Sequence, residues 1–205
     1  IREEDYLNPK NFVNDKRRRK QVDDLLRKMK RQIRINGGQH QATMHYIENY
    51  GYIPFWIVVK ILSFGIVSEL YQILKPENQV EIAKDFGVQV NELIVYLPIL
   101  ANFRNLCAHE DILYDHRAQR DIEDTIYHGQ LHIPKLNGEY IYGKNDLFAI
   151  VLILKQMLRK DDFFLLMSEM EYEIQILADK LKTISIEKVL DRMGFPINYE
   201  ELIKL

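Results

Sequence analysis

The sequence predicts an all-α fold, a helical bundle interrupted by one inserted loop or short β-hairpin. Segments in which apolar residues recur every three or four positions fill most of the 205 residues, and this is the spacing of a helix face. Prolines and glycines separate these segments, and one hairpin signal, Asn137-Gly138, lies among them. The hydrophobic share of 47% is enough for a core. We therefore expect about six or seven helices in one domain, or in one domain with an appendage.

The first predicted helix, residues 15–35, is amphipathic and basic. Its apolar residues lie one, three or four positions apart: Val22, Leu25, Leu26, Met29 and Ile33. The run Asn36-Gly37-Gly38 ends it. The polar and aromatic stretch 39–52 does not favour either a helix or a strand.

The later helices follow from their caps and breakers. One helix is expected at 54–74, with Pro54 in its first turn, and another at 77–85, before Gly87. A third should begin at a cap at Asn91 and reach residues 104–109. The last three are expected at 145–158, at 162–182 after a cap at Asp161, and between Ser185 and Gly194. Pro98 predicts a kink or interruption in the helix that begins at Asn91. Pro134 limits the hairpin around Asn137-Gly138 to a short or edge ladder.

Charge is distributed unevenly along the chain. The net charge is −2, but residues 10–34 hold eleven Lys or Arg and three Asp, which gives +8 and leaves −10 for the rest. Such asymmetry is typical of an arm or face that meets a polyanion, and a solvated helix face balanced by acidic neighbours is the alternative. We therefore divide the chain into a basic N-terminal helix, residues 1–38, and a bundle domain, residues 39–205. Because the chain begins with Ile, we expect further residues upstream.

The composition also excludes several classes of protein. A single cysteine, Cys107, allows neither an internal disulfide nor a cysteine-based zinc site, and it fits a reducing, cytoplasmic compartment. We expect no signal peptide, because the first residues are mostly charged. The longest apolar run, 52–68, contains Lys60. We interpret this run as a core helix and expect no membrane span.

The stretch most suggestive of chemistry is residues 103–110, Phe-Arg-Asn-Leu-Cys-Ala-His-Glu. The planar guanidinium of Arg104 can hold a phosphate, and His109 can transfer protons near neutral pH. Asn105 and His109 are four residues apart and share a helix face, whereas Arg104 and His109 are about 140° apart around a helix. One regular helix therefore cannot direct both side chains at one phosphate. Either the helix is distorted there, or a twofold dimer combines residues from two chains.

Several segments of the sequence resemble those of known protein families. Arg-x4-His with a polar residue directly after the arginine resembles the ribonuclease motif of the HEPN superfamily. The blocks Pro54–Val59, Leu62–Gly65 and Leu70-Tyr71, the run from Leu100 to Leu113, and Met193-Gly194-Phe195-Pro196 are similar to the Abi-like (abortive infection) family of bacterial phage-defence proteins. The resemblance covers roughly residues 44–197.

The resemblance implies a HEPN-like fold, a homodimer, and RNA cleavage without a metal or other cofactor. Its catalytic residues would be Arg104, Asn105 and His109. His109 would activate the 2′-hydroxyl or protonate the leaving 5′-oxygen, Arg104 would stabilise the phosphorane, and Asn105 would orient the ring or the phosphate. The structural alternatives are an interhelical salt bridge for Arg104, a helix-end hydrogen bond for His109, and a polar cap for Asn105. Glu110 departs from the many relatives with a polar residue or histidine there, and it either tunes or disables the site.

Other residues have candidate roles that the sequence alone leaves open. An RNA backbone could follow the cluster Lys16, Arg17, Arg18, Arg19 and Lys20, and a substrate groove could include Tyr114, His116 and Arg117.

Four further residues are better explained by structure than by chemistry. We interpret Cys107 as a small core residue. With Phe55 and Phe64, Trp56 could form a base-stacking platform, but the helical spacing and apolar company of these rings favour core packing. His128 and His132 are four residues apart, but the hairpin signal beside them and the lack of a third ligand argue against a metal site.

The sequence therefore predicts a metal-independent endoribonuclease of a phage-defence or toxin–antitoxin type system. It would act as a homodimer in the cytoplasm, and an antitoxin RNA or protein would be a further partner. The alternative is a non-catalytic RNA- or protein-binding module on the same fold.

Overall fold

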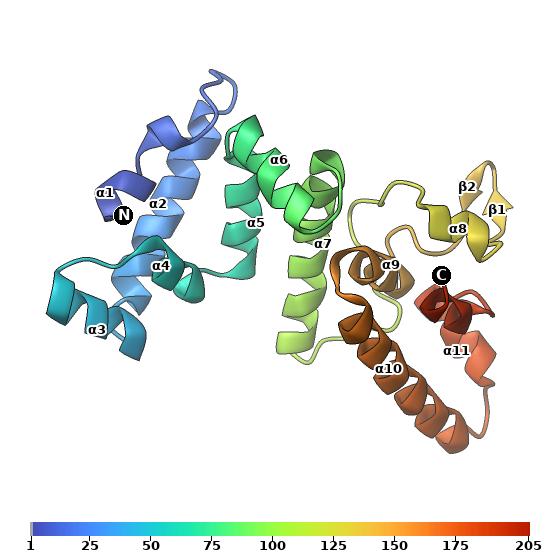
Figure 1. Cartoon of the computed structure of the whole chain (residues 1–205). Helices are drawn as coiled ribbons and strands as arrows, with labels where there is room; N and C mark the ends of the chain where they lie inside the picture. Colours follow the sequence, from blue (N-terminus) through green and yellow to red (C-terminus); the bar gives the residue numbers. More distant parts are fainter. Residues whose placement is uncertain (1) are drawn as a thin grey trace. The chain divides into compact units, whose positions relative to one another are not determined.

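A computed structural model describes residues 2–205 and confirms the all-α prediction (Figure 1). Within these residues there are eleven α-helices, two 3-10 turns and one two-stranded antiparallel hairpin. The helices are more numerous than predicted because several are short. The chain divides into two compact units, residues 1–82 and residues 83–205.

The first unit is built around the basic helix α2. Its elements are α1 (Glu3–Tyr6), η1 (Pro9–Asn11), α2 (Arg19–Asn36), α3 (Gln41–Tyr50), α4 (Phe55–Ile61), α5 (Phe64–Ile73) and most of α6 (Pro76–Asp85). Four apolar residues of α2 are buried, as the spacing predicted: Val22, Leu25, Leu26 and Met29. They pack against α4 and α5. The predicted division after residue 38 stays a prediction, but α2 shares its core with the helices that follow it.

The N-terminal segment is tied to this unit by specific hydrogen bonds. The Tyr6 hydroxyl donates to the Ile53 carbonyl at 3.0 Å, and the Ile53 N–H donates to the Glu3 carboxylate at 2.6 Å. Phe12 is buried and forms an isolated antiparallel bridge with Leu74. These contacts hold the residues before α2 against the link between α3 and α4 and against the end of α5.

The single helix predicted at 54–74 is wrong, because the chain breaks at Leu62. Leu62 has ψ 143° and so leaves the helical region. The Ser63 hydroxyl then accepts a hydrogen bond from the Ile66 N–H at 3.3 Å and caps α5. Serine favours this position because its oxygen satisfies an N–H that has no partner in the first turn. Two helices in place of one allow both to bury side chains against α2.

The second unit is arranged around α9. Its elements are α7 (Val90–Ala108), α8 (Ile126–Gln130), β1 (Lys135–Leu136), β2 (Glu139–Tyr140), α9 (Leu147–Met157), α10 (Lys160–Lys180), α11 (Ile186–Met193) and η2 (Tyr199–Ile203). Phe148, Leu152 and Ile153 of α9 are fully buried. Helix α9 packs on α7 and on α10, and α10 also packs on α11 and η2. The hairpin has two residues a strand, and Asn137 and Gly138 both have positive φ, as its sequence predicted.

Helix α7 begins differently from the prediction. Gln89, not Asn91, precedes its first turn, and the Gln89 N–H donates to the Glu92 carboxylate at 2.6 Å. Pro98 lies inside an α-helix that continues without interruption. Leu93, Tyr96 and Ile99 are buried on either side of it, and their packing compensates for the hydrogen bond that the proline cannot donate.

A buried polar cluster fixes the loop before α9. Asp146 accepts hydrogen bonds from the N–H groups of Ala149 and Gly143. His128 is fully buried. Its Nδ1 accepts from the Thr125 N–H at 3.0 Å, and its Nε2 lies 3.0 Å from the Gly143 carbonyl. The neutral ring with its proton on Nε2 satisfies both contacts, and burial lowers the pKa of His128. His128 is therefore a structural residue.

Candidate functional site

Helix α7 presents the Arg–Asn–x3–His motif at its C-terminal end. Phe103 is the last buried residue of the helix. Helix α7 ends at Ala108, and His109 is the residue that follows it. Arg104, Asn105, His109 and Glu110 are all exposed. An extended polymer such as RNA can reach side chains in this position without entering a cavity.

The motif residues contact one another only in part. Arg104 Nη1 donates to Asn105 Oδ1 at 3.3 Å. Within residues 2–205 Arg104 makes no salt bridge. The His109 backbone N–H donates to the Asn105 carbonyl at 3.0 Å and to the Leu106 carbonyl at 3.2 Å. The interhelical salt bridge considered for Arg104 is thus absent from the described chain, and its guanidinium is available to an anion.

The backbone conformation at the end of α7 decides whether the helix is distorted between Arg104 and His109. Helix α7 is regular through Ala108, so no distortion lies between Arg104 and the end of the helix. The chain departs from the helix only at His109, with φ −103° and ψ 8°, and at Glu110, which has a left-handed φ of 55°. Arg104 and His109 therefore project from different faces of one chain.

Cys107 does not lie in the core, which corrects our prediction. It is exposed, because the last turn of α7 extends past Phe103 and leaves position 107 without a packing partner. The apolar neighbours Leu106 and Ala108 are half-buried and exposed, respectively. Their apolar character suggested burial, but nothing in this part of the described structure covers that turn.

Two of the three residues predicted just after the motif anchor the loop. Tyr114 is exposed. His116 Nε2 lies 2.7 Å from Asn102 Oδ1 of α7, and its ring packs edge-on against Phe103. Arg117 donates to the Arg192 carbonyl at 2.8 Å at the end of α11. His116 and Arg117 thus hold this loop in place, and a role in RNA binding stays a prediction.

The basic cluster Lys16–Lys20 lies in the first unit, where the chain enters α2. All five side chains are exposed. One of them has a defined partner, because Arg18 Nη1 donates to the Gln72 carbonyl at 3.1 Å at the end of α5. Arg18 therefore anchors the cluster, while its neighbours present their charge to solvent.

The profile of the Abi-like protein family matches residues 2–115. This is more than half of the chain, and the matched segment includes both the basic cluster and the motif. The chain belongs to the Abi-like protein family. No curated protein and no solved structure matches the chain.

The Abi-like match differs in extent from the resemblance predicted at residues 44–197. It begins earlier, so the basic helix α2 lies within the family segment, and it ends six residues after His109. Helices α8 to α11 lie beyond the match. The HEPN assignment and the catalytic roles of Arg104, Asn105 and His109 stay predictions.

The prediction that Trp56 packs in the core is wrong. Its side chain is 58% exposed, while Ile57 and Val58 beside it are buried. Helix α4 has only seven residues and turns one face to α2. Position 56 lies on its other face. Phe55 and Phe64 are half-buried, so they fit the predicted packing better than Trp56 does.

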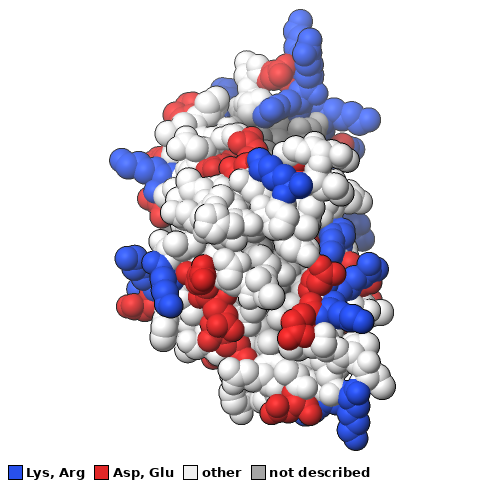
Figure 2. Space-filling view, turned by 90° about the vertical axis from the view of Figure 1, so that its right-hand side faces the viewer, with Lys and Arg blue, Asp and Glu red and all other residues white. Residues whose placement is uncertain are grey.

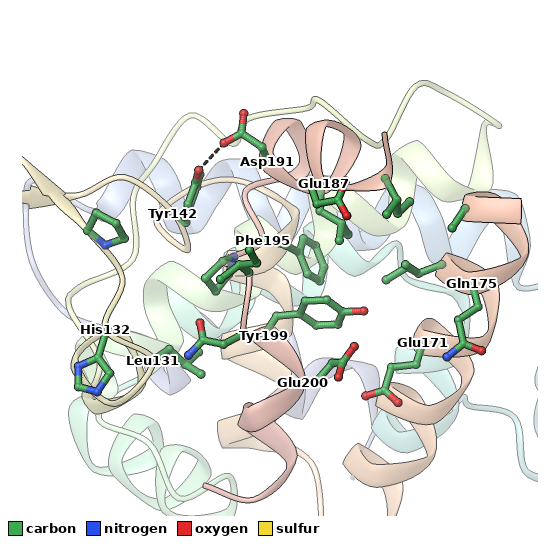
Figure 3. A pocket seen from close by; sticks show the side chains of 18 residues that line it. Leu131, His132, Tyr142, Glu171, Gln175, Glu187, Asp191, Phe195, Tyr199 and Glu200 are labelled. Atoms are coloured by element: carbon green, nitrogen blue, oxygen red, sulfur yellow. Dashed lines mark hydrogen bonds between the residues drawn. The ribbon is translucent and has the colours of Figure 1, made fainter. Parts of the chain in front are cut away.

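Beyond the Abi-like segment, α10, α11, η2 and the segment 131–142 line a partly open cavity of about 630 Å³ that the sequence analysis missed (Figure 3). Its apolar lining includes Leu131, Phe195 and Tyr199, and its four charged lining residues are all acidic: Glu171, Glu187, Asp191 and Glu200. The Tyr142 hydroxyl donates to Asp191, and this contact raises the pKa of Tyr142 to about 12. The apolar spacing of α10 and α11 carried the only sequence signal for it, and that spacing is common to core helices.

This cavity is a poor site for a polyanion. No residue of the motif lines it, and its carboxylates would repel phosphate. Figure 2 views the chain from the side on which Figure 1 draws the hairpin and α11, and acidic side chains border uncharged surface on that face. The exposed end of α7 is therefore the better candidate for RNA chemistry.

Within residues 2–205 no group of three or more His, Cys, Asp or Glu side chains could hold a metal ion. No single helix in the described chain is long and apolar enough to cross a membrane.

Proposed function

We propose that this Abi-like protein is a metal-independent endoribonuclease that acts in phage defence or as the toxin of a toxin–antitoxin pair in the cytoplasm. The observation that carries the proposal is the exposed motif at the end of α7, inside the matched family segment. The motif supplies a guanidinium with no salt-bridge partner in the described chain, an amide in contact with it, and an imidazole. These groups can bind a phosphate, orient it and move protons.

Cleavage would proceed by attack of the 2′-hydroxyl on the adjacent phosphorus. A new bond forms from the 2′-oxygen to phosphorus, and the bond from phosphorus to the 5′-oxygen breaks. His109 removes the 2′-hydroxyl proton or protonates the leaving 5′-oxygen, and Arg104 stabilises the charge that builds on the phosphorane. The products are a 2′,3′-cyclic phosphate and a 5′-hydroxyl, and no metal takes part.

The second half of the proposal is that the site is composite. Arg104 and His109 project from different faces of α7, so a twofold homodimer could pair Arg104 of one chain with His109 of its partner. Each site would then contain the phosphate clamp of one copy and the proton-transfer group of the other.

Purified protein incubated with RNA in EDTA tests the chemistry. Wild type should cut, and His109→Ala should lower the rate by roughly 10²- to 10⁴-fold, the usual contribution of general acid–base catalysis. His40→Ala changes another exposed histidine and should leave the rate unchanged. Equal absence of cutting by wild type and His109→Ala would overturn the nuclease proposal.

A mixing experiment tests the composite site. Arg104→Ala and His109→Ala are each expected to be inactive, but mixed dimers would contain one site with both native groups. Mixing equal amounts should restore about a quarter of the wild-type rate if dimers exchange freely. Size-exclusion chromatography of differently tagged copies confirms that exchange occurs. No recovery after exchange would show that each chain builds its own site.

A second candidate function is a non-catalytic RNA-binding module. The exposed basic cluster favours it, as does Glu110, whose exposed carboxylate adjoins His109 and would repel phosphate. In that case RNA binding survives His109→Ala and falls steeply with salt. An antitoxin RNA or protein would be a partner under either function.

A further inference from the structure

We propose that an exposed aromatic cluster on α3 and α4 binds the bases of single-stranded RNA by stacking. This inference rests on the proposed RNA substrate and assigns a binding site in the first unit. The cluster, here called the aromatic platform, consists of His45, Tyr46 and Tyr50 of α3 and Trp56 of α4.

The four rings form one connected cluster, which Trp56 joins through Tyr46. Tyr46 lies at the centre, with ring centroids 5.6 Å from His45, 5.5 Å from Tyr50 and 6.3 Å from Trp56. The His45 and Tyr50 rings are 6.1 Å apart. Tyr46 also packs against the core of the first unit. The platform is therefore held in place before any ligand arrives, which lowers the entropy cost of binding.

The outer rings are directed to solvent. Tyr50 is 60% exposed and Trp56 is 58% exposed, and His45 is exposed as well. Burial of aromatic side chains is usually stabilising. A contiguous group of exposed rings is therefore typical of a binding surface. Stacking a base on each face would remove this area from water.

The chemistry of the platform favours bases over an aliphatic partner. Its members are all rings, and every nucleobase has a flat face that can stack on them. Two aliphatic side chains, Ile47 and Val59, are exposed on the same helices but less so than Tyr50 and Trp56. The first unit as a whole holds fourteen Lys or Arg and ten Asp or Glu, a net +4 that suits a polyanion.

The charges carried by α3 and α4 themselves cancel. Glu48 is the carboxylate of α3, and Lys60 is the cation of α4, one turn after Trp56. Stacking, not ion pairing, would therefore supply the affinity at this site. It follows that a base must be unstacked from its neighbours to bind, so a duplex should bind much more weakly than a single strand of the same sequence.

Trp56 provides a direct probe, because it is the only tryptophan in the chain. The full chain carrying His109→Ala is titrated with a single-stranded oligoadenylate, so that cutting does not interfere, while tryptophan emission is recorded. We expect saturable quenching by the single strand and little quenching by an oligoadenylate–oligouridylate duplex. Unchanged emission with the single strand would overturn the proposal.

A pair of matched variants locates the binding. Tyr50→Ala should weaken binding of fluorescently labelled oligoadenylate by about 5- to 100-fold, which corresponds to the loss of one stacked base. Phe164→Ala removes a ring of α10 that is 58% exposed and should change nothing. Circular dichroism checks that both variants stay folded. Equal affinity of Tyr50→Ala and the parent protein, or an equal loss in Phe164→Ala, would contradict the assignment.

The quenching titration tests the aromatic platform independently of the cleavage assay. Quenching together with absence of cutting by wild type would support the platform and overturn the nuclease. Cutting by wild type without quenching would support the nuclease and overturn the platform. Quenching by a peptide mixture but not by RNA would show that the platform binds protein instead, and would also overturn the proposal.

Discussion

The two units of the chain differ most in charge. Residues 1–82 have fourteen basic and ten acidic side chains, a net +4, whereas residues 83–205 have fourteen basic and twenty acidic ones, a net −6. The basic unit lies almost wholly within the Abi-like match, and the acidic unit contributes mainly α7 with its motif to that match. Under the proposed function, this difference assigns the attraction of RNA and its cleavage to separate residues, so mutations should affect affinity and rate separately.

The units differ also in their buried ionisable groups. In the described part of the first unit the groups with shifted pKa values are the tyrosines Tyr6 and Tyr71, which titrate only at high pH. The second unit buries Asp146 and His128, whose pKa values are shifted in opposite directions by burial. The pH dependence of stability between pH 4 and pH 8 is therefore expected to come from the second unit.

The largest expected effect compares two glycines that end helices in the two units. Gly51 ends α3 with φ 74° and Gly194 ends α11 with φ 83°. A Cβ on Gly51 would meet open space, whereas a Cβ on Gly194 would overlap the Asp146 carboxylate. Gly51→Ala should cost about 1 kcal/mol from backbone strain alone, and Gly194→Ala about 3–5 kcal/mol. Urea denaturation measures both, and equal losses would show that the contact with Asp146 is unimportant.

The next prediction concerns Asp146 and pH. Burial raises the pKa of Asp146 to about 6. The folded state therefore binds a proton that the unfolded state has already lost. The stability from this group is fully present below the unfolded pKa and is lost as the pH rises through 6. Relative to wild type, Asp146→Asn should become more stable by up to about 3 kcal/mol between pH 4 and pH 7.5.

Denaturation curves of both proteins across this range measure that difference. His128, whose pKa is lowered by burial, opposes the effect below its ordinary pKa, but it is present in both proteins. The difference between them therefore isolates Asp146. Parallel stability curves for wild type and Asp146→Asn would show that the carboxyl group titrates normally when folded.

Much of the fold could be predicted from sequence because its signals are local. The helix start at Ser185, the terminator Gly194 and the turn Asn137-Gly138 are signals that act within a few residues, and each lies where the sequence placed it. The break at Leu62 was missed because residues 54–74 are apolar throughout, so periodicity could not reveal that two faces pack separately.

Exposure was the hardest property to predict. Trp56 and Cys107 have apolar neighbours, and we expected both in the core, yet both are exposed because their positions lie beyond the packed face of a short helix or the last packed turn of a long one. The motif itself was found from residue type and spacing. Whether a second copy completes the site depends on contacts between chains, which no pattern within one chain encodes.

The smallest expected effect tests the charge comparison directly. Lys16→Gln/Arg17→Gln/Lys20→Gln removes three exposed charges of the basic cluster and spares Arg18, which holds the Gln72 carbonyl. Affinity for single-stranded RNA should fall by about tenfold, or about 1.4 kcal/mol. The slope of log affinity against log salt should fall by about two, at roughly 0.7 for each lost phosphate contact.

A matched variant in the acidic unit provides the contrast. Lys180→Gln/Lys182→Gln/Lys188→Gln also removes three exposed charges, and it should leave both the affinity and the salt slope unchanged. The cleavage rate at saturating RNA should be the same in both triple variants, because neither touches the motif. Equal losses of affinity in the two variants would mean that RNA responds only to net charge. A selective loss in the first variant would instead locate the phosphate contacts at the start of α2.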